Sequence, residues 1–484
     1  MLAGTGSDVG KSVLTAGLCR IFLQDGYHPA PFKAQNMALN SFSTPDGLEI
    51  GRAQAVQAEA CGIDCMAEMN PLLLKPVDDR HSQVVLNGKA IGNYSAADYF
   101  NGKDRPALRE HVRGAFKRLA DRYNPIVMEG AGSIAEINLR DRDLVNMPMA
   151  ADAGAKVILV ADIDRGGVFA SAYGSIMLQN EEDRKRIAAI IVNKFRGDIR
   201  LFEDGVKILE EICGVPVLGV VPYFRDIHIE EEDSLSLAAK ERKAVEGKTN
   251  IGVVLLPHLS NFTDFDALER HPGVNLFYIK ESGQTADADI IILPGSKATI
   301  SDLAYLRMNG FDKAIAEAHL AGKSVVGICG GFQMLGVSVE DPDGVESDAR
   351  HADGLDILPV RTCLRGDKRV AQTGFSLPGD TRKCRGYEIH MGETVPVEKP
   401  SPFALLDDGG TDGFMLNEKT FGTYLHGVFD NPATVELLLR PYAPNAADTT
   451  FDYRRFREEQ YDRLASLLRE CLDIDRLYQI LSDD

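Results

Sequence analysis

The chain has 484 residues, with 53 lysines and arginines, 72 aspartates and glutamates, and a net charge of −19. The negative charge argues against binding to nucleic acid or to an anionic membrane. No apolar run approaches the ~20 residues of a membrane span, and the N-terminus lacks the pattern of a secretory signal. The eight cysteines form no CxxC pair. We therefore expect a protein of the reducing cytoplasm, without disulfides or a zinc ribbon.

Short apolar runs alternate with segments of helix length through the first half of the chain. These runs are residues 29–34, 126–128, 156–161, 188–192 and 215–221. Such alternation predicts a parallel sheet that is covered by helices on both faces. Residues 237–250 are polar and charged without an apolar period, which is typical of a linker. The first domain is therefore predicted to span residues 1–236.

The alternation resumes after the linker, with apolar runs at residues 251–256, 289–293 and 324–328. It predicts a second domain over 251–440. In the C-terminal segment, 441–484, apolar residues three and four apart predict one or two amphipathic helices, whose stripe we expect to contact the core rather than form a dimer face. The predicted fold is thus α/β, with two doubly wound, mainly parallel-sheet domains and a helical C-terminal tail.

A glycine-rich loop at the start of the chain ends in Gly10-Lys11-Ser12, just before a helical run. Backbone N–H groups and a helix N-terminus attract phosphate, Lys11 can reach the β- and γ-phosphates, and Ser12 can hold Mg²⁺. Thr5 stands where the usual phosphate-loop pattern has its first glycine. The residues predicted to bind ATP are Gly4, Thr5, Gly6, Ser7, Asp8, Val9, Gly10, Lys11, Ser12 and, at the end of a later strand, Asn193.

Carboxylates follow two of the predicted strands. Glu129 comes directly after the strand 126–128, where a magnesium ligand or a water-positioning group would face the phosphate loop. Asp162 and Asp164 end the next strand, at the sheet edge where ligands of α/β proteins gather. The alternative for these two aspartates is helix capping and loop solvation.

A second motif places Cys329 directly after an apolar strand and before Gly330, where a helix begins. A thiol on such an elbow, next to a helix N-terminus, is a candidate nucleophile. The backbone N–H groups of Gly330 and of Gly295, in the turn that ends the previous strand, are predicted to form an oxyanion hole. His426 ends an apolar-aromatic segment and is the candidate base. The alternative for Cys329 is a buried core thiol.

These motifs together resemble the cobyric acid synthase family. In that family a dethiobiotin-synthetase-like P-loop domain is fused to a class I glutamine amidotransferase domain of the cobalamin-biosynthetic subtype. The resemblance covers essentially the whole chain. Its specific stretches are residues 4–12, 33–41, 49–59, 129–145, 162–171, 193–198, 329–336 and 424–429.

The resemblance implies a ligase that uses ATP and Mg²⁺ and has no tightly bound prosthetic group. Cys329, assisted by His426, would release ammonia from L-glutamine, and the ammonia would displace phosphate from an acyl phosphate. The implied substrate is adenosylcobyrinic acid a,c-diamide, amidated at its b, d, e and g carboxylates. The alternative is cobyrinic acid a,c-diamide synthase or another glutamine-dependent P-loop amidoligase. A homodimer is left open.

The resemblance also assigns residues around the phosphate loop. Lys33 and Arg52 are expected at the acyl-phosphate site. The metal is expected at Ser12 and Glu129, with Asp46 as the second carboxylate. Glu49 is the alternative to Asp46.

The amidotransferase half departs from the usual pattern of its class at one position. A glutamate usually lies two residues after the histidine, but that position holds Val428 here. We therefore expect a dyad of Cys329 and His426, with Glu388 as an alternative source of the orienting carboxylate.

Overall fold

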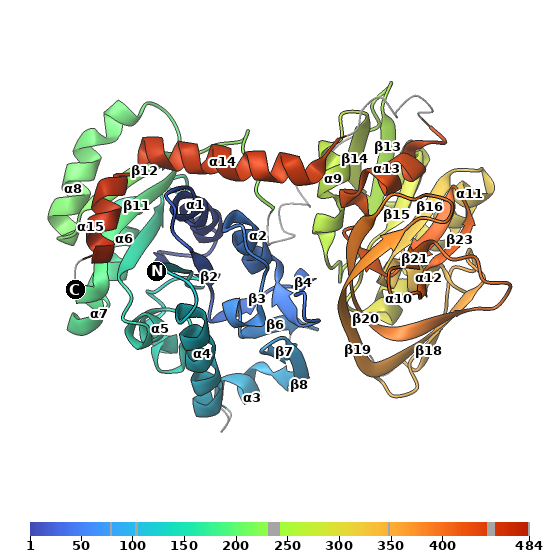
Figure 1. The fold of residues 1–484 in the computed structure, drawn as a ribbon, viewed down its shortest axis with the longest axis horizontal. Helices are drawn as coiled ribbons and strands as arrows, with labels where there is room; N and C mark the ends of the chain where they lie inside the picture. Colours follow the sequence, from blue (N-terminus) through green and yellow to red (C-terminus); the bar gives the residue numbers. More distant parts are fainter. Residues whose placement is uncertain (78–79, 102–104, 231–242, 347–348, 443–450, 483–484) are drawn as a thin grey trace. The chain divides into compact units, whose positions relative to one another are not determined.

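The structure is a computed structural model that describes residues 1–77, 80–101, 105–230, 243–346, 349–442 and 451–482 (Figure 1). Contacts within it divide the chain into two units, each discontinuous in sequence. The first contains Met1–Ala38, Ile50–Glu230 and Phe456–Asp484, and the second contains Leu39–Glu49 and Glu231–Arg455. Residues 237–242 of the predicted linker lie outside the described residues. A short piece of the first half of the chain, Leu39–Glu49, therefore belongs to the second unit.

The first unit is built on a parallel sheet with the strand order β1-β10-β11-β12. Two further strands, β2 and β9, pair in parallel, and a parallel bridge between Leu2 and Glu129 places the end of β9 beside β1. The strands are β1 (Leu2–Gly4), β2 (Ala30–Phe32), β9 (Ile126–Met128), β10 (Val157–Asp162), β11 (Ile187–Phe195) and β12 (Val217–Pro222). Because the strands run parallel, the phosphate loop after β1, Glu129 after β9 and Asn193 near the end of β11 all lie at the carboxyl ends of strands.

Apolar side chains of this sheet belong to two hydrophobic cores, one on each face of the sheet. In β10, Ile158 and Val160 join one cluster while Leu159 and Ala161 join the other, because successive side chains of a strand point to opposite faces. The doubly wound arrangement predicted from the alternation is thus confirmed. The helices of this unit before the tail are α1 (Lys11–Gln24), α2 (Arg52–Ala60), α3 (Ala96–Asn101), α4 (Arg105–Ala120), α5 (Met147–Asp152), α6 (Val168–Met177), α7 (Glu181–Arg186) and α8 (Glu203–Cys213).

The C-terminal tail forms two helices, α14 (Tyr453–Cys471) and α15 (Ile474–Ser482). Leu464 and Leu468 are fully buried in the same cluster as Leu14 of α1. A bridge between Gly219 and Leu472 brings the start of α15 to β12, and the two elements lie side by side in Figure 1. The apolar stripe of the tail therefore packs against the core of the first unit, as predicted.

A smaller sheet of order β3-β6-β7-β8, which was not predicted from the sequence, is inserted into the first unit. Its strands are β3 (Gln35–Met37), β6 (Leu72–Pro76), β7 (His81–Leu86) and β8 (Lys89–Ser95). A short pair, β4 (Ser41–Ser43) and β5 (Glu49–Gly51), lies at the two ends of the segment that joins the second unit.

The second unit contains the predicted second sheet, with the order β14-β13-β15-β16-β24-β23. All its neighbouring pairs are parallel except β23 with β24. The strands are β13 (Thr249–Val254), β14 (Val274–Ile279), β15 (Ile290–Leu293), β16 (Ser324–Ile328), β23 (Phe414–Asn417) and β24 (Thr420–Thr423). The helices are α9 (Asp266–Arg270), α10 (Thr299–Met308), α11 (Phe311–Leu320), α12 (Gly330–Leu335) and α13 (Pro432–Leu439).

A second, mainly antiparallel sheet completes this unit and was not predicted. It is dominated by the long hairpin of β19 (Val360–Ser376) and β20 (Cys384–Pro396). The short strand β25 (Leu425–His426) pairs with β20 and carries His426 to this sheet. Its other strands are β17 (Ser338–Glu340), β18 (His351–Asp353), β21 (Ala404–Leu406) and β22 (Thr411–Asp412).

Within the described part of the chain, no helix has both the length and the apolar character to cross a membrane.

Candidate functional site

The phosphate loop joins β1 to α1 in the first unit. Gly10 has a φ of 94° and directly precedes the helix, which begins at Lys11. A side-chain carbon at Gly10 would lie 2.2 Å from Nδ2 of Asn193, so only glycine fits this position. The Lys11 ammonium donates to the carbonyls of Gly6 and Gly132, at 3.0 Å each. The loop thus holds a buried lysine at the N-terminus of a helix, as a phosphate site requires.

Residues that end β11 support this loop from outside. Asn193 Nδ2 donates to the carbonyl of Val9 at 2.8 Å, and the Lys194 ammonium donates to the carbonyl of Asp8. Lys194 also pairs with Asp162 at 3.1 Å. The Asn193 amide, predicted to bind ATP, is therefore bonded to the loop backbone, and its contact with a nucleotide stays a prediction.

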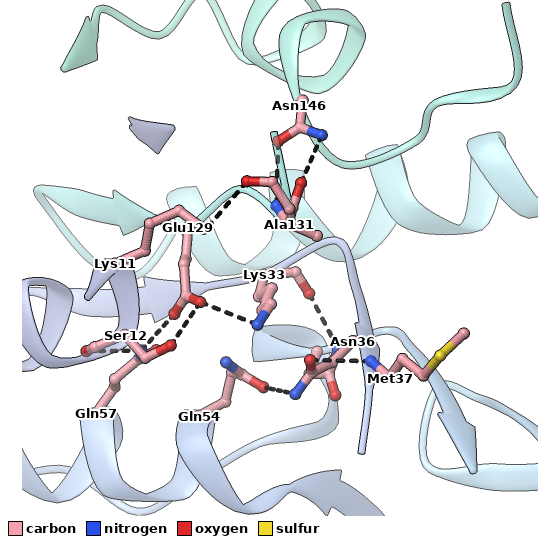
Figure 2. Close-up of polar contacts among 12 residues, drawn as sticks. Lys11, Ser12, Lys33, Asn36, Met37, Gln54, Gln57, Glu129, Ala131 and Asn146 are labelled. Carbon is pink, nitrogen blue, oxygen red and sulfur yellow. Dashed lines mark hydrogen bonds and ion pairs between the residues drawn. The ribbon is translucent and has the colours of Figure 1, made fainter. Parts of the chain in front are cut away.

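Glu129 is the centre of a buried polar cluster beside the loop (Figure 2). Its Oε1 accepts from the Ser12 hydroxyl at 2.8 Å and pairs with the Lys33 ammonium at 2.9 Å, while Oε2 accepts from Gln57 at 2.7 Å. Burial by itself raises the pKa of Glu129, but the attraction of Lys33 outweighs it and lowers the pKa below its ordinary value. The carboxylate is therefore ionised at neutral pH.

The structure brings together Ser12 and Glu129, both predicted at the metal site, and Lys33, predicted at the acyl-phosphate site; their roles stay predictions, and Gln57 was not predicted. Three further side-chain amides, those of Asn36, Gln54 and Asn146, lie near the cluster (Figure 2). Asn36 donates to Gln54 at 3.1 Å, and Asn146 bonds both backbone groups of Ala131, accepting at 3.0 Å and donating at 2.9 Å. Gln57 lies in α2, within the stretch 49–59 that resembles the family. This position was the sequence signal that could have identified it as a site residue.

Two of the other predicted residues have partners of their own. Arg52 is buried and pairs with Glu230, its Nε at 2.7 Å and its Nη2 at 2.6 Å, and Arg457 of α14 pairs with the same carboxylate at 3.2 Å. Arg52 thus helps hold the tail helix, and its contact with a substrate stays a prediction. Asp46 belongs to the second unit, where its carboxylate accepts from the Thr44 hydroxyl, and its role as a metal ligand also stays a prediction.

The chemistry of the donor atoms at the phosphate loop suits a magnesium ion. Mg²⁺ prefers hard oxygen ligands and is usually held by one or two carboxylates together with phosphate oxygens. Ser12 and Glu129 supply a hydroxyl and an ionised carboxylate whose oxygens lie 2.8 Å apart. No cluster of three or more His, Cys, Asp or Glu side chains suited to a metal occurs among the described residues.

Cys329 lies in the second unit on the turn between β16 and α12. Its φ is 52° and its ψ is −110°, a strained conformation for a residue other than glycine. Strain of this kind is found where a side chain must project from a sharp turn, as in nucleophile elbows. The Sγ atom lies 3.7 Å from the carbonyl of Ile389. This geometry is that of the elbow predicted from the sequence.

The buried imidazole of His426 is oriented by a carboxylate that the sequence analysis missed. Nδ1 of His426 lies 2.7 Å from Oδ2 of Asp264, and the other oxygen of Asp264 accepts from the backbone of Gly427 at 2.8 Å. The alternative carboxylate, Glu388, contacts His390 instead, at 3.2 Å. The predicted dyad of Cys329 and His426 is therefore corrected, because a third residue, Asp264, contacts His426. The signal was a polar stretch, residues 260–264, just after the predicted strand 251–256.

Electrostatics favour a charged His426. Burial by itself lowers the pKa of His426, but the attraction of Asp264 and of Cys329 outweighs it and raises the pKa to about 10. The histidine is then an imidazolium at neutral pH. A positively charged imidazole in this position is able to donate a proton to a leaving group.

The two turns predicted to form an oxyanion hole lie together at this site. A side-chain carbon at Gly330 would lie 2.8 Å from the backbone nitrogen of Ser296, and one at Gly295 would lie 3.4 Å from Cε1 of His426. The Ser296 hydroxyl donates to Asp302 at 2.6 Å, which fixes the second turn. The turns of Gly295 and Gly330 are thus brought next to His426.

The fold and the two sites define a class of protein, in which a P-loop nucleotide-binding unit and a cysteine–histidine amidotransferase-like unit form one chain. Residues 1–237 match the CobQ/CobB/MinD/ParA nucleotide binding domain, and residues 250–434 match the CobB/CobQ-like glutamine amidotransferase domain.

Whole-length relatives narrow this class further. The chain is 61% identical to the cobyric acid synthase of Phocaeicola vulgatus, 60% to that of Bacteroides fragilis and 54% to that of Parabacteroides distasonis. Each match covers 100% of this chain and 98% of the relative. The chain belongs to the cobyric acid synthase family.

Proposed function

We propose that this protein is a glutamine-hydrolysing, ATP-dependent ligase of cobalamin biosynthesis. It amidates the b, d, e and g carboxylates of adenosylcobyrinic acid a,c-diamide to give adenosylcobyric acid. The observation that carries the proposal is the presence, in one member of this family, of an ordered phosphate-loop cluster and a complete cysteine–histidine–aspartate arrangement.

The second unit performs the hydrolysis of glutamine. Sγ of Cys329 attacks the carbonyl carbon of the side-chain amide, and the backbone N–H groups of Gly330 and Gly295 bind the oxyanion that forms. His426 donates its proton to the nitrogen as the C–N bond breaks, and ammonia leaves. His426 then takes a proton from water, which attacks the thioester and releases glutamate. Asp264 keeps the Nδ1 proton in place, so that Nε2 exchanges the proton.

The first unit activates the carboxylate. A carboxylate oxygen of the corrinoid attacks the γ-phosphorus of ATP, and ADP leaves. Ammonia then attacks the acyl carbon, and phosphate leaves as the amide forms. Such transfer depends mainly on positioning and on neutralising negative charge. Lys11 and the helix N-terminus are assigned to the ATP phosphates, and Lys33 to the carboxylate that becomes phosphorylated.

Ser12 and Glu129 are the residues that would hold a magnesium ion, which, when bound, neutralises the charge of the phosphates. Within the protein, Lys33 supplies the positive charge next to Glu129. Gln57 restrains the second oxygen of this carboxylate. These contacts keep Glu129 ionised and oriented toward the loop.

Incubation of adenosylcobyrinic acid a,c-diamide with the protein, Mg-ATP and ammonium tests the activity of the first unit without glutamine. Stepwise conversion of carboxylates to amides, dependent on ATP, is expected in the mass spectrum. With cobyrinic acid as the only corrinoid, conversion of the a and c carboxylates would instead identify a cobyrinic acid a,c-diamide synthase.

A further inference from the structure

Residues 39–49 form a segment that leaves the first unit and returns to it. Just before the segment, Lys33 and Asn36 lie in or beside the Glu129 cluster. Just after it, Gln54 and Gln57 of α2 lie there as well. The segment itself belongs to the second unit. A single loop of chain therefore has both ends in the nucleotide-binding site and its middle in the amidotransferase unit.

The first part of the segment holds the turn that carries Asp264. The backbone N–H of Ser41 donates to the side chain of Asn261 at 3.0 Å, and the backbone N–H of Phe262 donates to the side chain of Asn40 at 3.3 Å. Asn261 has a φ of 52° and begins the short helix Phe262–Phe265. The segment thus fixes the start of the turn whose Asp264 orients His426.

The same segment also supports the ring of His426 through a second route. The ring of Phe42 packs against that of Tyr387 with centroids 4.5 Å apart, and Tyr387 stacks on His426 with centroids 5.2 Å apart and planes 25° from parallel. Tyr387 and His426 are both buried. Phe42 is therefore one ring away from the catalytic imidazole.

A hydrogen bond and an ion pair join the segment to β19 of the antiparallel sheet. Gln372 of β19 donates to the carbonyl of Ser43 at 2.8 Å, and the Lys368 ammonium pairs with the buried carboxylate of Glu49. The Ser41 hydroxyl donates to the same carboxylate at 2.8 Å, which ties the two ends of the segment together. Both ends of the segment are therefore held by contacts with one buried carboxylate.

We infer that residues 39–49 couple the state of the nucleotide-binding site to the orientation of His426, with Phe42 and Asn40 as positioning residues. Substrates at the Glu129 cluster act on Lys33, Asn36 and Gln57, which are joined covalently to the two ends of the segment. Movement of the segment shifts both supports of His426, the Asp264 turn and the ring of Tyr387. Glutamine is then hydrolysed fastest when the carboxylate is being activated. This inference rests on the proposed function.

The test measures glutamine hydrolysis with and without Mg-ATP and adenosylcobyrinic acid a,c-diamide. The wild-type protein is expected to hydrolyse glutamine faster when both are present. Phe42→Ala is expected to reduce this stimulation roughly two- to tenfold, the range expected for loss of one aromatic contact. Phe42→Tyr, which keeps the ring, is expected to retain it. Phe42→Leu keeps the volume without the ring and provides a second variant should Phe42→Ala fail to fold.

Tyr305→Ala is the matched control, because Tyr305 is a half-buried aromatic of the same unit whose ring partner is Phe311. It is expected to leave the stimulation unchanged. Full stimulation in folded Phe42→Ala or Phe42→Leu, or no stimulation in the wild-type protein, would overturn the inference. Amidation driven by ammonium is measured in parallel. If the wild-type protein lacks ammonium-driven amidation, the proposed function is wrong. If it shows this amidation but one of the overturning results above is found, only the inferred coupling is wrong.

Discussion

Replacing Asp264 by asparagine removes the carboxylate that lies 2.7 Å from Nδ1 of His426. The two side chains are 1% and 2% exposed. Removing one partner of a buried ion pair costs about 3–5 kcal/mol, because the remaining charge is left uncompensated. Here His426 can lose its proton instead of remaining charged. We therefore expect the cost to appear mainly as loss of the imidazolium and of its orientation. At ~1.4 kcal/mol for each factor of ten, a cost of this size lowers the rate of glutamine hydrolysis by roughly 10²- to 4 × 10³-fold.

The pH dependence gives this prediction a direction. The pKa of His426 is raised to about 10 from its ordinary 6.5. The contribution of the pair to stability is then complete below pH 6.5 and is lost as the pH rises through 10. In Asp264→Asn the main opposing effect is burial, which lowers the pKa. We expect the alkaline limit of glutamine hydrolysis to move to lower pH, and stability to become less dependent on pH over this window.

The assay compares steady-state glutamine hydrolysis from pH 6 to 10 in the wild-type protein, Asp264→Asn and Glu388→Gln. Glu388 is the matched control, because its carboxylate contacts His390 rather than His426. Amidation driven by ammonium should persist in Asp264→Asn, which shows that the first unit is intact. An unchanged rate and pH profile in Asp264→Asn, or an equal loss in Glu388→Gln, would refute the assignment of Asp264.

Three further predictions concern the two sites and the tail. Cys329→Ala should abolish glutamine-dependent amidation but spare the ammonium-driven reaction in the same mass-spectrometric assay; loss of both would contradict separate sites. Lys11→Ala should lower the rate even with ammonium, by at least about tenfold, because a buried cation at the phosphates is lost; an equal rate would exclude residues 4–12 as the ATP loop. Leu468→Ala should destabilise the first unit by about 2–5 kcal/mol, measured as a lower thermal transition, whereas Leu201→Ala, at a residue 86% exposed, should leave it unchanged.

The parallel sheets were predictable because their strands are buried on both faces and therefore read as continuous apolar runs. The run at residues 156–161 became β10 (Val157–Asp162), and that at residues 324–328 became β16 (Ser324–Ile328). The hairpin of β19 and β20 was missed. Many of its side chains are exposed or half-buried, so its residues carry a weak pattern that resembles loops.

The residues of the candidate sites also fall into those that local sequence predicts and those that it does not. Cys329, Gly330 and Ser12 were predictable because their chemistry depends on neighbours in sequence, at the turn between a strand and a helix. Asp264 and His426 lie 162 residues apart, and only the fold brings them together. Sequence spacing therefore gave no means of choosing between Asp264 and Glu388.

Segment 39–49 illustrates a different limit. Only its ends, residues 39–41 and 49, fall in stretches that resemble the family, and the first half of the chain was expected to fold as one domain. The contacts of Asn40, Ser41 and Phe42 with residues more than 200 positions away assign it to the second unit. Hydrogen bonds between such distant positions follow from the folded backbone and not from local propensity.

Mass spectrometry of adenosylcobyrinic acid a,c-diamide, after incubation with the protein, Mg-ATP and glutamine, shows whether the protein amidates this substrate. We expect stepwise replacement of carboxylates by amides, which ends at adenosylcobyric acid and does not occur when ATP is omitted. An unchanged corrinoid, in a reaction in which both ATP and glutamine are hydrolysed, would contradict the proposed substrate and direct the search to another carboxylate.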